Sequence, residues 1–428
     1  MAEQNKMEKI VSLCKRRGFV FPSSEIYGGM ANAFDYGPYG VELKNNIQQL
    51  WWKRFVQSRD DMVGIDAALI MNPEVWKASG HLSEFSDPLV ECKKCHERFR
   101  EDQLESEKKC PTCNGDLTEA KQFNLMLKTF LGPAEEQTDI AYFRPEIAQA
   151  MFVDFKNVLD TSRKKLPFGI ASQGKAFRNE ITPGNFIFRT REFNLMELEY
   201  FVRPEDWGNR FEYWLKEMRE WLTDLGVNLK HVHEVEIPDG ERAHYSKRTV
   251  DFEYDYPFGQ KELYGLAYRT DFDLKKHYKT APYRDQETGE EIYPHVVEPT
   301  FGLDRSVLVT LLEAYREEDD RVVLKLPFKL APIKIAVFPL LKNKPELVKK
   351  AREIYDDLRK NFTVAWDDRG NIGKRYYSQD EIGTPFCLTV DFETLEKDNS
   401  VTVRDRDTMK QERIKINELG DYFQKKLR

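Results

Sequence analysis

The sequence predicts an α+β protein with antiparallel strands in its larger part and a small α/β domain at its end. Residues 174–202 contain two alternating strand patterns around a turn, and residues 294–315 show a strand, a turn and a helix. Beyond residue 333, strand and helix patterns alternate, which is typical of an α/β domain. At 428 residues the chain is too long for one ordinary core, so we expect two or three domains.

The first pair of strands carries charged residues where a core would need apolar side chains. A period of two places Arg178 and Glu180 together in the middle of the first strand, and Phe193 and Glu197 on one face of the second. Thr-Pro-Gly-Asn at residues 182–185 predicts the turn between them. One interpretation is a solvent-exposed sheet face on which these charged residues form ion pairs. The other is an anion cradle, with arginines for phosphate, an aromatic residue for a flat ring and carboxylates for a cation.

Apolar residues at helical spacing predict a helix around residues 43–55 and an aromatic-rich amphipathic helix over residues 209–225. Core packing is the simplest interpretation of both. In the later strand–turn–helix pattern, Gly302 permits the turn and Arg305 lies in the first helical turn. The free N–H groups and the helix dipole at that position favour an anion, so Arg305 is well placed for a phosphate.

The C-terminal part is expected to begin after a proline-containing linker near residues 326–332. Its predicted elements are strands at 333–340, 362–366 and 386–391, a helix at 346–360 and a helical turn at 376–381.

Two CxxC pairs, separated by 14 residues, predict a metal site. Four thiolates at this spacing suit tetrahedral zinc, and a closed set of four cysteines indicates a structural ion, whereas a chance cluster is the weaker alternative. His96 is a spare potential ligand that we interpret as a bystander. The expected ligands are Cys92, Cys95, Cys110 and Cys113.

Composition describes a soluble globular protein, with 40% hydrophobic and 32% charged residues. No run approaches the roughly 18 to 20 apolar residues that a membrane span needs, and the first residues lack the apolar stretch of a signal peptide. We therefore expect a cytoplasmic protein without a membrane segment. The formal charge of −7 argues weakly against binding nucleic acid over the whole surface, although local patches could still bind it.

Several segments resemble one family. FRNE, followed by a loop and by FIFRTREF and MELEYF, closely resembles motif 2 of the class II aminoacyl-tRNA synthetases, specifically the dimeric glycyl-tRNA synthetases. DYGPYGVELKNNI resembles motif 1, PHVVEPTFGLDR resembles motif 3, and RPEIAQAMFVDF and KELYGLAYRTDFDL resemble two further family segments. DDRGNIGKRYYSQDEIG resembles the anticodon-binding domain. These segments occur in the family's order across nearly all of the chain.

The resemblance implies a class II synthetase-like α+β catalytic domain on an antiparallel sheet over residues 1–328, with a zinc-binding insertion at 88–120. It also implies an α/β anticodon-binding domain at 329–428 and a homodimer. The implied reaction joins glycine to ATP as glycyl-adenylate and then transfers glycine to the 3′ end of tRNA-Gly, with Mg²⁺ accompanying ATP.

In this reaction the carboxylate of glycine is the nucleophile, so no protein base is needed. The protein must instead supply alignment and charge for the α-phosphate. The catalytic residues implied by the resemblance are Arg178, Arg305 and Glu298.

The implied ATP site joins motif 2, motif 3 and a pair of residues that borders ATP. It comprises Arg178, Asn179, Glu180, Phe188, Arg189, Thr190, Arg191, Glu192, Phe193, Glu262, Leu263, Gly302, Leu303, Asp304 and Arg305. The implied glycine site, in which glutamates meet the ammonium group, comprises Arg100, Glu146, Phe193, Asn194, Leu195, Met196, Glu197, Glu298, Pro299, Thr300, Phe301 and Gly302. Arg269 is a further candidate for its floor.

Three positions depart from the family pattern: Ile147 stands for threonine, Ala150 for glycine and Thr300 for serine. Each adds bulk, so we expect a tighter glycine pocket. The competing class is a non-catalytic binding protein that keeps the synthetase fold. Such proteins lose the ATP residues, which this chain keeps.

Overall fold

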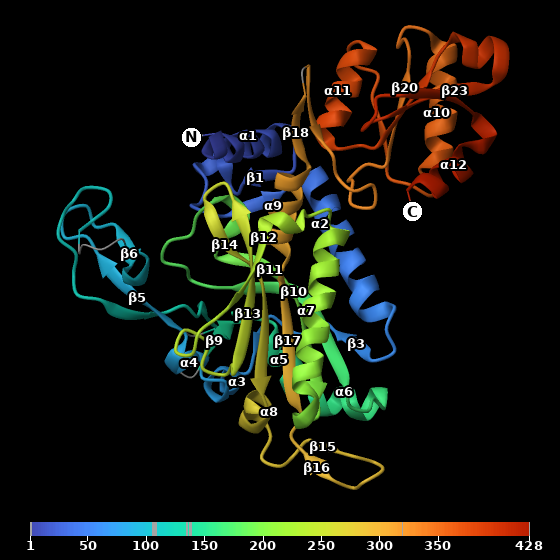
Figure 1. Cartoon of the computed structure of the whole chain (residues 1–428). Helices are drawn as coiled ribbons and strands as arrows, with labels where there is room; N and C mark the ends of the chain where they lie inside the picture. Colours follow the sequence, from blue (N-terminus) through green and yellow to red (C-terminus); the bar gives the residue numbers. More distant parts are fainter. Residues whose placement is uncertain (1, 105–108, 134–135, 137–138, 319, 428) are drawn as a thin grey trace.

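The larger part of the chain is built around one seven-stranded sheet (Figure 1). The computed structural model describes residues 2–104, 109–133, 136, 139–318 and 320–427. The strand order is β12-β13-β14-β17-β11-β10-β3, and only the β10–β3 pair is parallel. The bounds are β12 Val232–Glu236, β13 Arg248–Tyr256, β14 Gly259–Thr270, β17 His295–Gly302, β11 Glu192–Val202, β10 Phe168–Phe177 and β3 Met62–Ile65. The predicted antiparallel architecture is confirmed.

Helices cover one face of this sheet and form the main hydrophobic core. They are α2 Pro38–Trp52, α7 Trp207–Asp224 and α9 Leu303–Ala314. The rings of Trp51, Phe55 and Trp221 lie between 5.3 and 6.3 Å from the ring of Phe301 on β17. Core packing, the interpretation of the two helical stripes, is therefore confirmed.

The opposite face is covered at one end by α5 Ala148–Val153, α6 Phe155–Ser162 and α8 Phe272–His277. Phe155 of α6 packs on Phe168 and Phe201 of the sheet, with ring centroids 5.7 and 4.6 Å away. The cavity described below lies on another part of this face, and residues of β5, of β6 and of the segment after β7 help to line it.

Shorter elements surround the sheet, and Figure 1 shows β5 and β6 extending away from it. A three-stranded sheet, in the order β6-β5-β7, carries the cysteines, and a second one has the order β4-β9-β8. The bounds of these and other short elements are α1 Ala2–Arg17, β1 Val20–Pro22, β2 Phe34–Tyr36, β4 Ile70–Met71, α3 Pro73–Ala78, α4 His81–Glu84, β5 Ser86–Glu91, β6 Arg98–Arg100, β7 Lys121–Asn124, β8 Lys128–Phe130, β9 Ile140–Phe143, β15 Tyr283–Arg284, β16 Glu291–Ile292, β18 Tyr315–Glu318 and β19 Arg321–Leu324.

The C-terminal part forms its own five-stranded sheet and core, as the alternating pattern predicts. The strand order is β21-β20-β22-β23-β24, in which β20 is parallel to both of its neighbours. The bounds are β20 Ile335–Pro339, α10 Pro345–Leu358, β21 Val364–Trp366, α11 Ile372–Ile382, β22 Phe386–Val390, β23 Ser400–Asp405, β24 Gln411–Lys415 and α12 Leu419–Lys426. The last two strands and α12 were not among the predicted elements.

One buried acid ties this part to the rest of the chain. Asp380 of α11 is fully buried and binds Arg321 of β19 at 2.9 Å and Arg404 of β23 at 2.8 Å. Within the described residues, no helix is long and apolar enough to cross a membrane.

The prediction that Arg178 and Glu180 lie in mid-strand is wrong. The β10–β11 ladder ends at the pair Phe177 and Glu192, and the next residues leave the sheet because the Asn179 N–H donates to the Leu125 carbonyl at 2.8 Å. Both charged residues therefore lie on the loop that leads to the predicted turn.

Candidate active site

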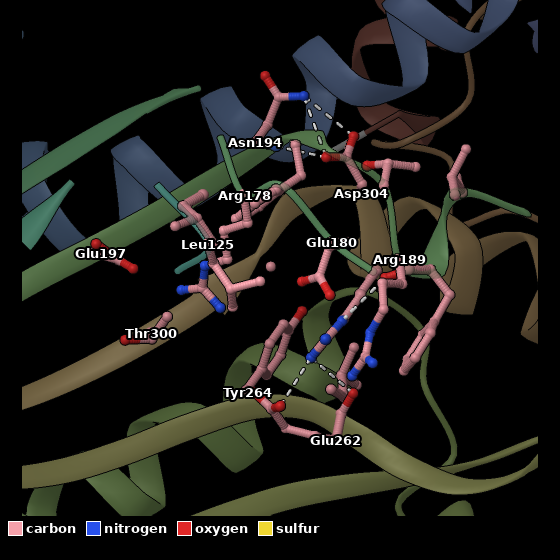
Figure 2. Close-up of a pocket in the computed structure, with 18 of the residues that line it drawn as sticks. Leu125, Arg178, Glu180, Arg189, Asn194, Glu197, Glu262, Tyr264, Thr300 and Asp304 are labelled. Atoms are coloured by element: carbon pink, nitrogen blue, oxygen red, sulfur yellow. Dashed lines mark hydrogen bonds and ion pairs between the residues drawn. The ribbon is translucent and has the colours of Figure 1, made fainter. Parts of the chain in front are cut away.

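A cavity of about 260 Å³ opens on the sheet (Figure 2). Glu197 and Thr300 lie at one end of the view, and Arg189 and Glu262 lie at the other. The predicted residues that line it are Arg100, Arg178, Glu180, Phe188, Arg189, Thr190, Phe193, Asn194, Leu195, Glu197, Glu262, Leu263, Thr300, Gly302, Asp304 and Arg305. Motifs far apart in the sequence therefore share one cavity.

Several predicted residues do not line the cavity. Met196 and Phe301 belong to the core on the opposite face, because the period of two along a strand sends alternate side chains there, and Leu303 at the start of α9 packs in the same core. Their side chains do not line the cavity, so the cavity gives no support to their predicted roles in binding. The remaining predicted residues outside the cavity lining are Asn179, Pro299, Glu146, Glu298, Arg269, and Arg191 and Glu192, which line a neighbouring cavity. Glu146, Glu298 and Arg269 are buried next to Glu197, which does line the cavity.

Buried carboxylates gather at the Glu197 end. Glu146 is 8% exposed, Glu197 3% and Glu298 6%. Arg269 beside them is fully buried, and it donates to Glu298 at 2.9 Å and to both oxygens of Asp273 at 2.8 and 2.9 Å. One guanidinium thus balances several acids, and the remaining negative charge favours a small cation in the cavity.

These acids differ in their pKa values. Burial alone would raise the pKa of Glu146, but His81, Arg269 and Gln149 hold it well below its usual range. Burial, followed by the nearby Glu298 and Glu146, raises the pKa of Glu197. Burial and Glu146 also raise the pKa of Glu298, although Arg269 opposes the shift. The group therefore holds protons that a bound cation would displace.

The segment that carries Glu146 is anchored by its neighbour Arg144. The Arg144 guanidinium is buried under β10 and donates to the carbonyls of Lys175 at 2.7 Å and Ala67 at 2.9 Å. A Cβ on Gly174 would lie 2.2 Å from Arg144 Nη2, so only glycine fits there. The Ile147 N–H donates to Glu197 Oε2 at 3.2 Å and fixes that carboxylate as well.

The extra bulk at Ile147 and Ala150 lies outside the cavity. The Ile147 side chain packs with Ala176 and Leu195, and Ala150 is buried in α5. The expectation that these two residues narrow the pocket is therefore not supported, whereas Thr300 does line it.

Arginines line the middle of the cavity, where Arg178 lies close to both Glu197 and Glu262, and the end opposite the acids. Arg178 lies 5.3 Å from the ring centroids of both Phe85 and Phe193, and it donates to the Pro145 carbonyl at 3.1 Å. Arg305 lies in the first turn of α9, as predicted, and pairs with Glu262 at 3.2 Å. This end can bind a flat ring and an anion.

The four predicted cysteines come together in the insertion. Their sulfur atoms all lie within 4.8 Å of one another, and Cys92–Cys113 and Cys95–Cys110 are 3.5 Å apart. A disulfide has sulfurs about 2.05 Å apart, whereas thiolates around one zinc ion lie about 3.8 Å apart. The donor set and its spacing fit a closed tetrahedral metal site. The side chain of His96 is 75% exposed and pairs with Glu91.

Sequence reasoning missed the residues that hold the acids in place: His81, Gln149 and Asp273. Gln149 donates to Glu146 at 3.0 Å and to Asp273 at 2.9 Å, and His81 Nε2 lies 3.3 Å from Glu146. A buried glutamine in an otherwise apolar helix was the one available signal.

Two family models match the chain. Residues 130–331 match the core domain of class II tRNA synthetases (G, H, P, S and T), and residues 334–426 match an anticodon binding domain. The fold and the site thus define a class II aminoacyl-tRNA synthetase.

Curated relatives narrow this class. Glycine–tRNA ligases from Alkaliphilus oremlandii, Geobacillus thermodenitrificans and Streptomyces coelicolor are each 50% identical to the chain. The alignments cover 100%, 98% and 99% of this chain and 100%, 97% and 99% of those proteins. The chain belongs to the glycine–tRNA ligase family.

Proposed function

We propose that the chain activates glycine with ATP as glycyl-adenylate and transfers the glycyl group to the 3′ end of tRNA-Gly. The observation that carries the proposal is one small cavity that is lined by Glu197, the outermost member of a buried acid cluster, and by Arg178, Arg189 and Arg305. An ammonium group at the acids and a triphosphate at the arginines would bring the glycine carboxylate to the α-phosphate.

The proposed roles follow from position. Glu146, Glu197 and Glu298 meet the ammonium group, while Arg178 and Arg305 stabilise the charge on the α-phosphate in the transition state. Phe193 stacks on adenine.

Carboxylate oxygens suit Mg²⁺, and Glu180 Oε2 is buried without a hydrogen-bond partner in the described structure. Glu180 and Glu262 would therefore hold Mg²⁺, which would neutralise phosphate charge.

Glycine-dependent exchange between ATP and pyrophosphate tests the proposal without tRNA. We expect exchange that needs glycine, followed by charging of tRNA-Gly when the tRNA is added. Well-folded protein without exchange would favour the non-catalytic binding protein that keeps this fold.

We also propose that Cys92, Cys95, Cys110 and Cys113 hold a structural zinc ion. The strand β5 leads from Asp87, which binds Arg100 at 2.9 Å beside the cavity, to the first of these cysteines. Loss of zinc should therefore slow exchange while the C-terminal part stays folded. Metal analysis of unchelated protein should find one zinc per chain, and its absence would refute the site.

We further propose a homodimer with the catalytic part at 1–328, the insertion at 88–120 and the anticodon-binding part at 329–428. Ile26 (88% exposed), Tyr27 (86%) and Met30 (65%) form an apolar loop beside motif 1, which supports a protein contact there. Sedimentation should give twice the chain mass, and charged substitutions in this loop should reduce it. Cytoplasmic location remains a prediction.

A further inference from the structure

Each oxygen of Glu146 lies close to one side-chain nitrogen that can donate a hydrogen bond. Oε1 accepts from Gln149 Nε2 at 3.0 Å, and Oε2 faces His81 Nε2 at 3.3 Å. Arg269 is more distant, with Nη2 at 3.9 Å from Oε1, and its shorter contacts go to Asp273 and Glu298. A carboxylate accepts about four hydrogen bonds. Glu146 thus keeps capacity for a ligand.

The negative charge of Glu146 is unfavourable at this position, because Glu197 and Glu298 lie nearby and repel it. Arg269 shares its charge among three acids, so it cannot by itself fix the orientation of Glu146. The contact with His81 is therefore a substantial part of what holds this carboxylate.

His81 is itself held rigidly and is 4% exposed. Its ring lies 5.6 Å from Trp76 and 5.4 Å from Phe85, and its Nδ1 lies 2.8 Å from Ser79 Oγ. Gly80, with φ of 87°, makes the sharp turn between α3 and α4 that brings Ser79 and His81 together.

Chemistry decides which nitrogen carries hydrogen. An ionised Glu146 only accepts, so His81 Nε2 must be protonated at this distance. If His81 is neutral, its Nδ1 accepts a hydrogen bond from the Ser79 hydroxyl. If His81 is charged, its Nδ1–H donates to the Ser79 oxygen, and the Ser79 hydroxyl donates to the Trp76 carbonyl at 3.4 Å. Ser79 satisfies Nδ1 in both states.

We propose that His81 is a positioning residue for glycine: its Nε2–H fixes the Glu146 carboxylate toward the substrate ammonium group, and Ser79 keeps the hydrogen on Nε2. The inference rests on the proposed function. It assigns a role to a residue that touches no substrate and does not line the cavity.

The test compares His81→Leu, His81→Gln and Ser79→Ala in glycine-dependent pyrophosphate exchange. Removing a hydrogen bond to a charged group should raise the glycine KM about 10- to 100-fold in His81→Leu, with the ATP KM unchanged. Glutamine keeps an N–H donor near the Nε2 position, so His81→Gln should recover most of the glycine affinity. Ser79→Ala should raise the glycine KM about two- to tenfold.

His295→Leu is the matched control, because His295 meets the Tyr268 hydroxyl and does not line the cavity. It should leave the glycine KM unchanged. An unchanged glycine KM in folded His81→Leu, or a loss confined to kcat, would overturn the proposal. If His81→Leu does not fold, an unchanged glycine KM in Ser79→Ala overturns it. Absence of exchange in the unsubstituted protein would instead count against the proposed function.

Discussion

At the end of the cavity assigned to glycine, Arg269 is completely buried and contacts three carboxylates. Where the proposed ATP site meets the acids, Arg178 stays partly exposed and lies beside two aromatic rings, and within the described residues its guanidinium donates to one main-chain carbonyl. The Arg269 guanidinium is therefore bound by the protein's own carboxylates, whereas the Arg178 guanidinium has N–H groups left to donate to a ligand. The same type of side chain is thus held by the protein in Arg269 and is left available in Arg178 for the catalytic role proposed above, because its partners differ.

The largest expected effect is on stability at the glycine end. Arg269→Met should lower the free energy of unfolding by about 3 to 5 kcal/mol, because buried carboxylates lose their balancing charge. Urea unfolding measures it. Arg178→Ala is the matched comparison and should cost only about 1 kcal/mol. Equal losses in the two variants would contradict the contrast between the ends.

The second prediction concerns catalysis at the ATP end. Arg178→Ala should slow glycine-dependent exchange about 100- to 1000-fold, because a donor to the transition state is lost. Circular dichroism and the dimer mass should stay unchanged. Near-normal exchange in this variant would remove Arg178 from the proposed mechanism.

The third prediction separates the two ends by pH. Burial and the nearby acids raise the pKa of Glu197 to about 8, so this group is protonated at pH 6 and must release its proton to bind ammonium. The glycine KM should therefore fall as the pH rises from 6 to 8, by up to about tenfold per unit. The ATP KM should stay nearly flat, because the arginines remain charged.

The stability of the glycine-free protein should change in the opposite direction: it should fall, not rise, as the pH increases. Above the pKa that Glu197 has in the unfolded chain, the unfolded state loses this proton while the folded state keeps it. Without glycine, the contribution of Glu197 to the free energy of unfolding should therefore fall with pH until about pH 8. Saturating glycine should reduce this fall. Parallel pH profiles for the glycine and ATP KM values would rule out proton release at the acid cluster.

The smallest effect is expected at Thr300. It lies opposite both Glu197 and Gly265 in the sheet and lines the cavity. Thr300→Ser removes one methyl group, which should reduce discrimination against alanine by about 1 kcal/mol while turnover with glycine persists. Paired exchange assays measure the ratio of kcat/KM for the two amino acids. An unchanged or higher ratio would mean that the methyl faces away from the substrate.

Much of the site could be predicted because its signals are local. The CxxC spacing brought the cysteines into one cluster, and the period of two placed Phe193 and Glu197 on one face of β11. The position of Arg305 at a helix start followed from the strand–turn–helix pattern. Such patterns depend on neighbours within a few residues, which the sequence displays directly.

The sequence by itself determined the antiparallel core, the α/β end, the cluster of four cysteines and the chemical types gathered at the cavity. Only the tertiary structure decided that Arg178 leaves its strand and that His81 meets Glu146. It also shifts the pKa of Glu146 down and the pKa values of Glu197 and Glu298 up. The physical reason is that a side chain's charge and role depend on its burial and its partners, and packing supplies these from distant parts of the chain.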